Sequence, residues 1–185
     1  MLPNLLKLSR LIDRLSAGVG RSVAWLVLAA VLISAGNALA RKLFNSSSNA
    51  FLEVQWYLYS AVFLLAAAHT LLRQEHVRID VLSARWSART RAWVDVFGIV
   101  FFLLPLVVVV VGLSWPLLVR TYVSGEMSSN AGGLIRWPVL ALLPLAFALL
   151  GVQGISELIK RLAWLKGLLP EPAQTAGPAS EAEHP

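Results

Sequence analysis

Three histidines are the side chains of this sequence best suited to hold a haem or a metal ion. His69 and His76 fall in one helical segment or at its exit, and His184 lies in the last residues. A haem between transmembrane helices needs histidines from different helices, and a metal site needs three or four converging ligands. The sequence has no cysteine and no such ligand spacing. It therefore predicts no metal, no haem and no other cofactor.

Patterns typical of enzymes are also missing from the sequence. It contains neither a glycine-rich nucleotide loop nor the residue arrangement of a hydrolase triad. A redox or other membrane enzyme is the weakest of the alternatives on these grounds. The sequence therefore predicts no catalytic residue and a protein that is not an enzyme.

Charged side chains lie near the ends of the apolar segments, as Glu53, Asp95 and Glu157 do. An ionisable group inside a membrane is costly and normally marks a pathway or a buried partner. The central thirds of the apolar segments consist mainly of Leu, Val, Ala, Phe and Ile. A solute path through this chain alone is therefore not predicted.

Those apolar segments are long enough to cross a bilayer. The chain is 57% hydrophobic and 14% charged, against about 25% charged in a typical soluble domain. A run of about 18 apolar residues spans the hydrocarbon core as a helix. We therefore predict an all-α integral membrane four-helix bundle over residues 22–169, with spans at about 22–39, 52–72, 93–119 and 137–159. Pro105 and Pro116 are expected to bend the third span.

The flanking segments differ from the spans in composition. Residues 1–21 place Leu5, Leu8, Ile12 and Leu15 at helical spacing among basic residues, which predicts a short amphipathic helix on the membrane face. A merely basic anchor for the first span is the alternative. Residues 170–185 have no apolar period and many helix breakers, which predicts a disordered tail.

The basic residues indicate how the spans are oriented. Cytoplasmic loops carry an excess of Lys and Arg. Twelve basic residues flank the spans on one side and four on the other, the four being Arg41, Lys42, Arg120 and Arg136. Both termini are therefore expected in the cytoplasm. Orientation signals and lipid headgroups account for the net charge of +6 better than nucleic acid does, so the bilayer and not nucleic acid is the expected partner.

A polar and aromatic group opens the second span. Glu53, Gln55, Trp56 and Tyr57 are suited to anchor the helix of another protein through hydrogen bonds and ring burial. Small residues such as Ser60 and Ala67 recur a heptad apart and allow close helix approach. We predict a subunit interface at these six residues.

Two stretches carry a family resemblance. Residues 49–57 read Asn-Ala-Phe-Leu-Glu-Val-Gln-Trp-Tyr, and residues 73–82, after the span, read Arg-Gln-Glu-His-Val-Arg-Ile-Asp-Val-Leu. Together with Ser124–Asn130, the length and the four spans, they resemble the DctQ-like small membrane subunits of tripartite ATP-independent periplasmic (TRAP) transporters. The resemblance covers about residues 10–165.

The resemblance implies a division of labour in a bacterial inner membrane. A periplasmic binding protein would capture an organic acid, a large membrane subunit would import it with a sodium gradient, and this chain would support the large subunit without catalysis. Independently of the resemblance, apolar residues alternate with Arg78 and Asp80 in the loop after the second span, which predicts protein contact there or an internal Arg78–Asp80 pair. The predicted contact residues are Arg73, His76, Arg78 and Asp80. An independent small carrier or channel is the alternative, and the transported acid is not assigned by the sequence.

Overall fold

The computed structural model describes residues 2–44, 49–73 and 86–169, and most of these residues are helical. Its elements are α1 (Leu2–Phe44), α2 (Asn49–Arg73), α4 (Ala88–Gly98), the π-helical segment η1 (Ile99–Leu103), α5 (Leu104–Ser124) and α6 (Trp137–Leu165). Among the described residues, four helical stretches are long and apolar enough to cross a membrane, and α4, η1 and α5 together form one of them. The predicted all-α membrane fold is confirmed.

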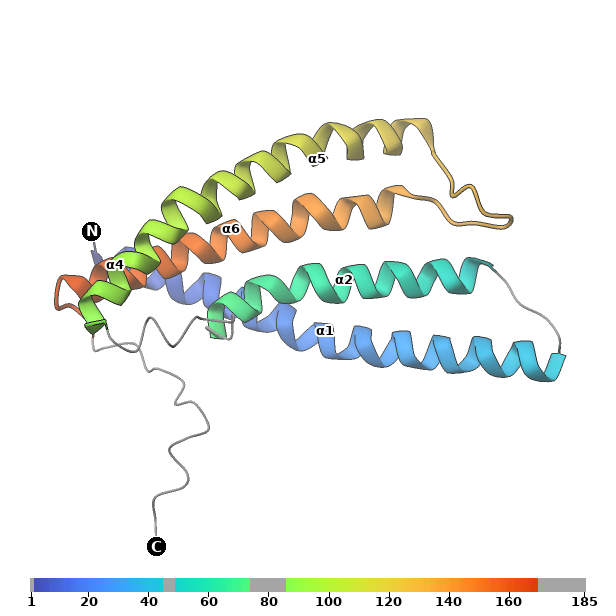
Figure 1. The fold of residues 1–185 in the computed structure, drawn as a ribbon, viewed down its shortest axis with the longest axis horizontal. Helices are drawn as coiled ribbons and strands as arrows, with labels where there is room; N and C mark the ends of the chain where they lie inside the picture. Colours follow the sequence, from blue (N-terminus) through green and yellow to red (C-terminus); the bar gives the residue numbers. More distant parts are fainter. Residues whose placement is uncertain (1, 45–48, 74–85, 170–185) are drawn as a thin grey trace, which may run out of the picture.

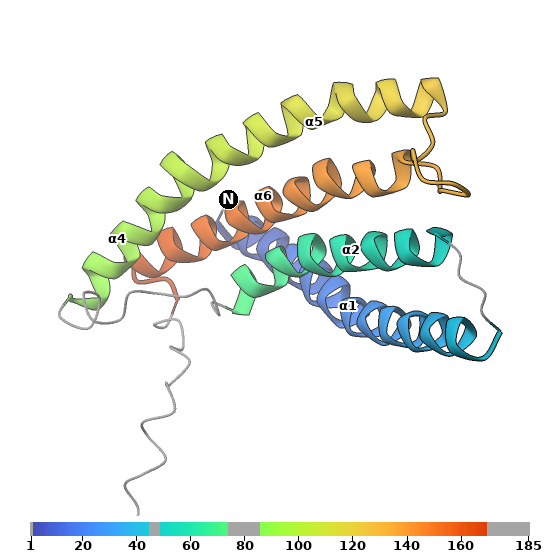
Figure 2. The same ribbon diagram turned by 45° about the vertical axis from the view of Figure 1, so that its right-hand side comes forward.

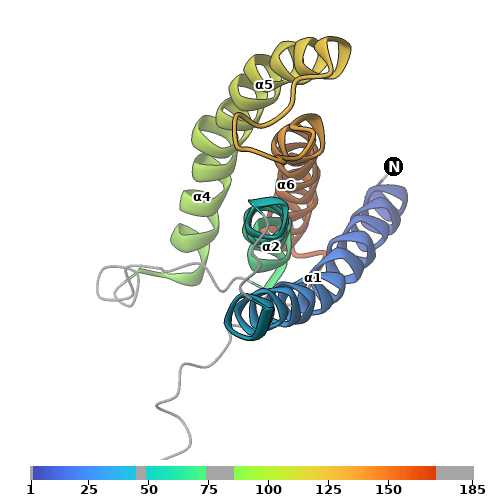
Figure 3. The same cartoon turned by 90° about the vertical axis from the view of Figure 1, so that its right-hand side faces the viewer.

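Helix α6 is the central element of the array. It contacts α1 and α2 on one side and α4, η1 and α5 on the other, so the helices form an open layer rather than a closed ring (Figure 3). The connection from α5 to α6 and the start of α2 lie at one end, which we call the loop end (Figure 1). The beginnings of α1 and α4 and the end of α6 lie at the other, which we call the terminal end.

Helix α1 runs without interruption through the segment predicted as a separate amphipathic helix. Its 43 residues correspond to a length of about 65 Å, twice the roughly 30 Å of a bilayer core. In its first part, Leu8, Leu11 and Leu15 are exposed, whereas Ser9, Ile12 and Ser16 are buried. The boundary predicted near residue 22 therefore does not interrupt the helix, and in this segment the serine face is the one that packs inward.

The third membrane stretch curves as a continuous arch (Figure 2). Proline lacks the N–H that an α-helix needs and collides with the preceding turn. Pro105 stands in the first turn of α5, directly after the widened turn η1, where the N–H of Leu104 bonds to the C=O of Ile99. The predicted bend at Pro105 is thus accompanied by a π-helical turn, which relieves the clash.

Glycines bring neighbouring helices close to α6. A Cβ added at Gly151 would lie 2.8 Å from Val107 Cγ1, and one added at Gly154 would lie 2.7 Å from Leu103 Cδ2. Small residues allow close packing where lipid removes most of the hydrophobic drive for helix association. The contact of α6 with η1 and α5 therefore depends on these two positions.

A similar close approach joins α1 to α2, and it supplies a testable prediction. A Cβ at Gly20 would lie 2.3 Å from His69 Cγ and 2.8 Å from His69 Cβ, whereas nothing lies within 4 Å of one at Gly18. Gly20→Ala should force the helices apart and destabilise the chain by about 1–3 kcal/mol. Gly18→Ala should be neutral or stabilising by up to about 1 kcal/mol. Thermal unfolding in detergent checks both, and equal effects would contradict this packing.

The outer faces of the array are apolar. Large exposed side chains include Trp25, Phe63, Val108, Leu113 and Val123, each more than two thirds exposed. A soluble monomer rarely exposes large apolar patches, and so many exposed apolar side chains indicate a membrane environment. These faces are suited to lipid and to other membrane helices.

Candidate functional site

The loop end is held together by one buried carboxylate. Glu53, in the second turn of α2, is 8% exposed. Its Oε1 accepts hydrogen bonds from Ser128 Oγ and from Asn130 Nδ2, the latter at 2.7 Å, and its Oε2 accepts one from Leu134 N at 2.6 Å. We call Glu53, Ser128, Asn130 and Leu134 the Glu53 cluster. It fastens the segment between α5 and α6 to α2.

Two neighbours of Glu53 on the same helix face reinforce this attachment. Asn49 and Tyr57 lie one turn before and one turn after Glu53, so the three side chains share one face of α2. Asn49 Nδ2 donates to Ala131 O, and Tyr57 Oη donates to Ile135 O, both at 3.1 Å. One face at the start of α2 therefore binds residues 125–136, which we call the 125–136 loop.

The 125–136 loop also has internal structure. Met127 and Ile135 form an antiparallel bridge, and Ser128 N donates to Leu134 O at 2.8 Å. Arg136 forms an ion pair with Glu126 across its base. Gly125 and Gly132 have φ angles of 61° and 71°, where a side chain would be strained. The loop is thus a compact unit and presents its donors to Glu53 in a fixed arrangement.

The terminal end contains a second polar cluster, between α1 and α6. Asp13 Oδ1 accepts from Gln153 Nε2 at 3.0 Å and from Ser156 Oγ at 2.8 Å, and Lys160 Nζ lies 3.1 Å from Asp13 Oδ2. Lys160 also pairs with Glu157. Ser16 Oγ donates to Gln153 Oε1, and Ser9 Oγ bonds to Ser156 Oγ, both at 2.7 Å. We call the set the Asp13 network: Ser9, Asp13, Ser16, Gln153, Ser156, Glu157 and Lys160.

The residue after Lys160 reaches the opposite neighbour of α6. Arg161 Nη2 lies 3.2 Å from Asp95 Oδ2 of α4, and the two side chains are 10% and 24% exposed. Consecutive basic residues of α6 thereby bind acids of α1 and α4. The terminal end of the array is fastened on both sides of α6.

Carboxylates are among the groups from which membrane proteins build cation and proton paths. Each of the five carboxylates in the described ranges 2–44, 49–73 and 86–169 bonds within the chain: Asp13, Glu53, Asp95, Glu126 and Glu157. The arrangement serves to fix helices and a loop.

Comparison with protein families agrees with this assembly of membrane helices. The family model for the DctQ component of tripartite ATP-independent periplasmic transporters matches residues 30–163, which is 134 of the 185 residues. The chain belongs to this family. DctQ proteins are the small membrane component of TRAP transporters, which also comprise a large membrane subunit and a periplasmic binding protein. No curated protein and no solved structure matched the chain in the corresponding searches.

The DctQ match includes the Glu53 cluster entirely and the Asp13 network in part. Gln153, Ser156, Glu157 and Lys160 lie within residues 30–163, whereas Ser9, Asp13 and Ser16 precede them. The family resemblance expected from the residues around Glu53 is confirmed.

The structure separates the six residues predicted as a subunit interface. Glu53 and Tyr57 bond to the 125–136 loop of the same chain. Trp56 is 71% exposed, and Ser60 and Ala67 are half-buried. Gln55 lines a pocket beside α1. Contact of any of them with the large subunit stays a prediction.

The residues predicted to make contacts after the second span are mostly not described. Arg73 is the last residue of α2 and is exposed. His76, Arg78 and Asp80 lie outside the described residues, so their predicted contacts stay predictions.

The Asp13 network was not predicted from the sequence, although its residues carry a signal. Ser9, Asp13 and Ser16 follow helical spacing in α1, and Gln153, Glu157 and Lys160 do so in α6. Two polar stripes of this kind in membrane-adjacent helices favour pairing between them, because an unpaired polar group is costly in lipid.

Proposed function

We propose that this chain is the non-catalytic support subunit of a TRAP transporter that imports an organic acid. The large subunit would move the acid with a sodium gradient after a periplasmic binding protein delivers it. The engagement of all five described carboxylates within the chain carries this proposal. Sodium coupling needs free oxygen ligands near the bilayer midplane, and an organic anion needs donors or cations there.

The packing supports a role as a fixed reference for a moving partner. A support must keep its shape while the transport domain moves beside it. Glu53 fixes the loop end, and the basic pair of Lys160 and Arg161 fixes the terminal end on both sides of α6. Large exposed apolar faces remain for the partner and for lipid.

We further propose that both termini lie in the cytoplasm of a bacterial cell and that the loop end faces the periplasm. The distribution of twelve basic residues against four supports this orientation in the inner membrane. The 125–136 loop would then lie on the side from which the binding protein approaches.

Reconstitution separates a support subunit from an independent carrier. Liposomes containing only this chain should show no sodium-dependent uptake of organic acids, because the central thirds of its spans consist mainly of apolar residues. Liposomes with the large subunit and the loaded binding protein should show uptake, and the chain should copurify with the large subunit. Liposomes with the large subunit and binding protein but without this chain are the control. Saturable uptake by this chain alone would favour the carrier alternative.

A further inference from the structure

A pocket between α1 and α2 at the loop end is separate from both polar clusters. Its volume is about 470 Å³, within the range of roughly 300–1,000 Å³ that small-molecule pockets occupy. Helix α1 contributes four polar or charged side chains and α2 contributes one, with two small or apolar residues between them. The lining residues are Ser34, Asn37, Ala38, Arg41, Lys42, Leu52 and Gln55.

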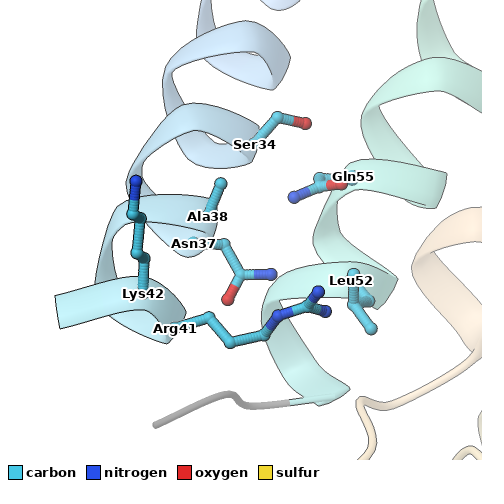
Figure 4. A pocket seen from close by; sticks show the side chains of 7 residues that line it. All are labelled: Ser34, Asn37, Ala38, Arg41, Lys42, Leu52 and Gln55. Carbon is cyan, nitrogen blue, oxygen red and sulfur yellow. The ribbon is translucent and has the colours of Figure 1, made fainter. Parts of the chain in front are cut away.

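The polar side chains of this pocket converge on the space between the two helices. Arg41 and Asn37 extend from α1 toward α2, and Gln55 extends back from α2 toward α1 (Figure 4). Lys42 lies along α1 at the edge of the pocket (Figure 4). The pocket thus presents an array of hydrogen-bond donors that includes two positive charges.

Nothing within the described part of the chain satisfies these donors. In residues 2–44, 49–73 and 86–169, no hydrogen bond or ion pair is made by the side chains of Arg41, Lys42, Asn37 and Gln55. No acidic residue lines the pocket, and Glu53 on the neighbouring turn of α2 is engaged by the 125–136 loop. Basic residues in the last turn of α1 complement its helix dipole. The helix dipole explains why positively charged residues such as Arg41 and Lys42 occur at this end of α1. It does not explain why they line the same pocket as two amide side chains.

The surroundings of the pocket are suited to an acyl chain. Val31 and Val27 precede Ser34 by one and two turns of α1, and Tyr59 and Phe63 follow Gln55 by one and two turns of α2. All four are exposed, between 43% and 80%. Residues at such spacing share a helix face, so apolar side chains extend from the polar pocket toward the middle of both spans.

We propose that this pocket binds the phosphate headgroup of an anionic phospholipid, with an acyl chain along the apolar side chains of α1 and α2. Phosphate accepts several charge-assisted hydrogen bonds, for which arginine is the best-suited donor and lysine a point charge. The pocket lies at the end of two membrane spans, the depth at which headgroup phosphates occur. The lipid would fill the space between the helices and stiffen the loop end.

Native mass spectrometry of the full chain, alone and with the large subunit, tests this site with phosphatidylglycerol, phosphatidylcholine and inorganic phosphate as probes. We expect one phosphatidylglycerol molecule to be retained in preference to phosphatidylcholine, with no competition from millimolar inorganic phosphate. The double variant R41Q/K42Q should weaken this binding by about 10- to 100-fold. Ala38→Phe keeps both charges but fills the pocket, and it should also abolish retention.

Arg120→Gln is the matched control for Arg41→Gln. It removes one positive charge from the loop-end half of α5, outside the pocket, and should leave phosphatidylglycerol binding unchanged. If Arg120→Gln and Arg41→Gln lost phosphatidylglycerol binding equally, the binding would depend on general surface charge and the proposal would be overturned. Binding of inorganic phosphate as tight as that of the lipid would make the pocket a soluble-anion site instead. Loss of the lipid when the large subunit binds would assign the pocket to a protein partner.

Discussion

Replacing Glu53 by leucine is expected to release the 125–136 loop from α2. Leucine has a similar size but accepts no hydrogen bond, so Ser128 Oγ, Asn130 Nδ2 and Leu134 N would all lose their acceptor. A buried donor without a partner costs more than an ordinary hydrogen bond contributes, and charged acceptors contribute most. Hydrogen exchange of the loop amides in the full chain should therefore accelerate by more than about tenfold.

Glu53→Gln and Glu126→Gln show whether the effect belongs to Glu53. Glutamine at position 53 keeps one acceptor oxygen and turns an amide group toward a donor, so exchange should increase less than in Glu53→Leu. Glu126→Gln makes the same chemical change in an ion pair whose two side chains are 40% and 48% exposed, and it should have little effect. Unchanged exchange in Glu53→Leu would contradict the docking role. If the loop is released, weaker copurification of the large subunit would show that the partner depends on it.

Spans and fold class followed from the sequence because lipid imposes a simple requirement. Every backbone polar group must bond internally inside a bilayer, so long apolar runs are helices. The predicted boundaries were conservative: the first span was expected at about 22–39, whereas α1 extends over Leu2–Phe44. Hydropathy detects the apolar part of a helix and not its amphipathic extension. The segment before residue 22 is therefore predicted as a separate amphipathic helix, whereas in the structure it continues into the span without a break.

The sequence patterns did not reveal which residues far apart in the chain form side-chain contacts. The sequence predicts that Glu53 anchors the helix of another protein, whereas its hydrogen-bond donors in the structure are Ser128, Asn130 and Leu134 of the same chain. One sequence does not specify which helix faces meet, so a second protein and a distant loop were both possible partners. The Ser124–Asn130 stretch lies between the last two predicted spans, but its contact with α2 follows only from the fold.

The Asp13 network shows the same difficulty for α1 and α6. The serines of α1 fall between leucines whose spacing is typical of an amphipathic helix on the membrane surface. The prediction was therefore based on the leucines and not on the serines. In the structure Ser9 and Ser16 are each 1% exposed, and Gln153 and Ser156 are fully buried. Small hydroxyl side chains pack closely between membrane helices and also satisfy polar neighbours, which makes the polar face the inner one.

Replacing Lys160 by methionine is expected to destabilise the pairing of α1 with α6 more than any single change at Asp13. Lys160 is the cation between Asp13 and Glu157, so its removal leaves two carboxylates that both bond to the amide of Gln153. Removing the charge of one partner in a mostly buried network costs about 3 kcal/mol. Asp13→Asn leaves the Lys160–Glu157 pair intact and should cost about 1–2 kcal/mol.

The two single variants and their double variant form a cycle that isolates the coupling. Lys160→Met leaves the carboxylates of Asp13 and Glu157 without their cation, and Asp13→Asn removes one of these charges. The double variant should therefore lose less free energy of unfolding than the sum of the two single variants, by at least about 0.5 kcal/mol. Lys166→Met makes the same side-chain change six residues later, at an exposed position. The Lys166 side chain makes no hydrogen bond or ion pair in the described ranges, so this variant should stay within about 0.5 kcal/mol of the parent. Denaturant titration of helicity in mixed micelles measures all four variants. If Lys160→Met matched Lys166→Met, or if the cycle were additive, the Asp13 network would not be what fastens the first part of α1 to α6.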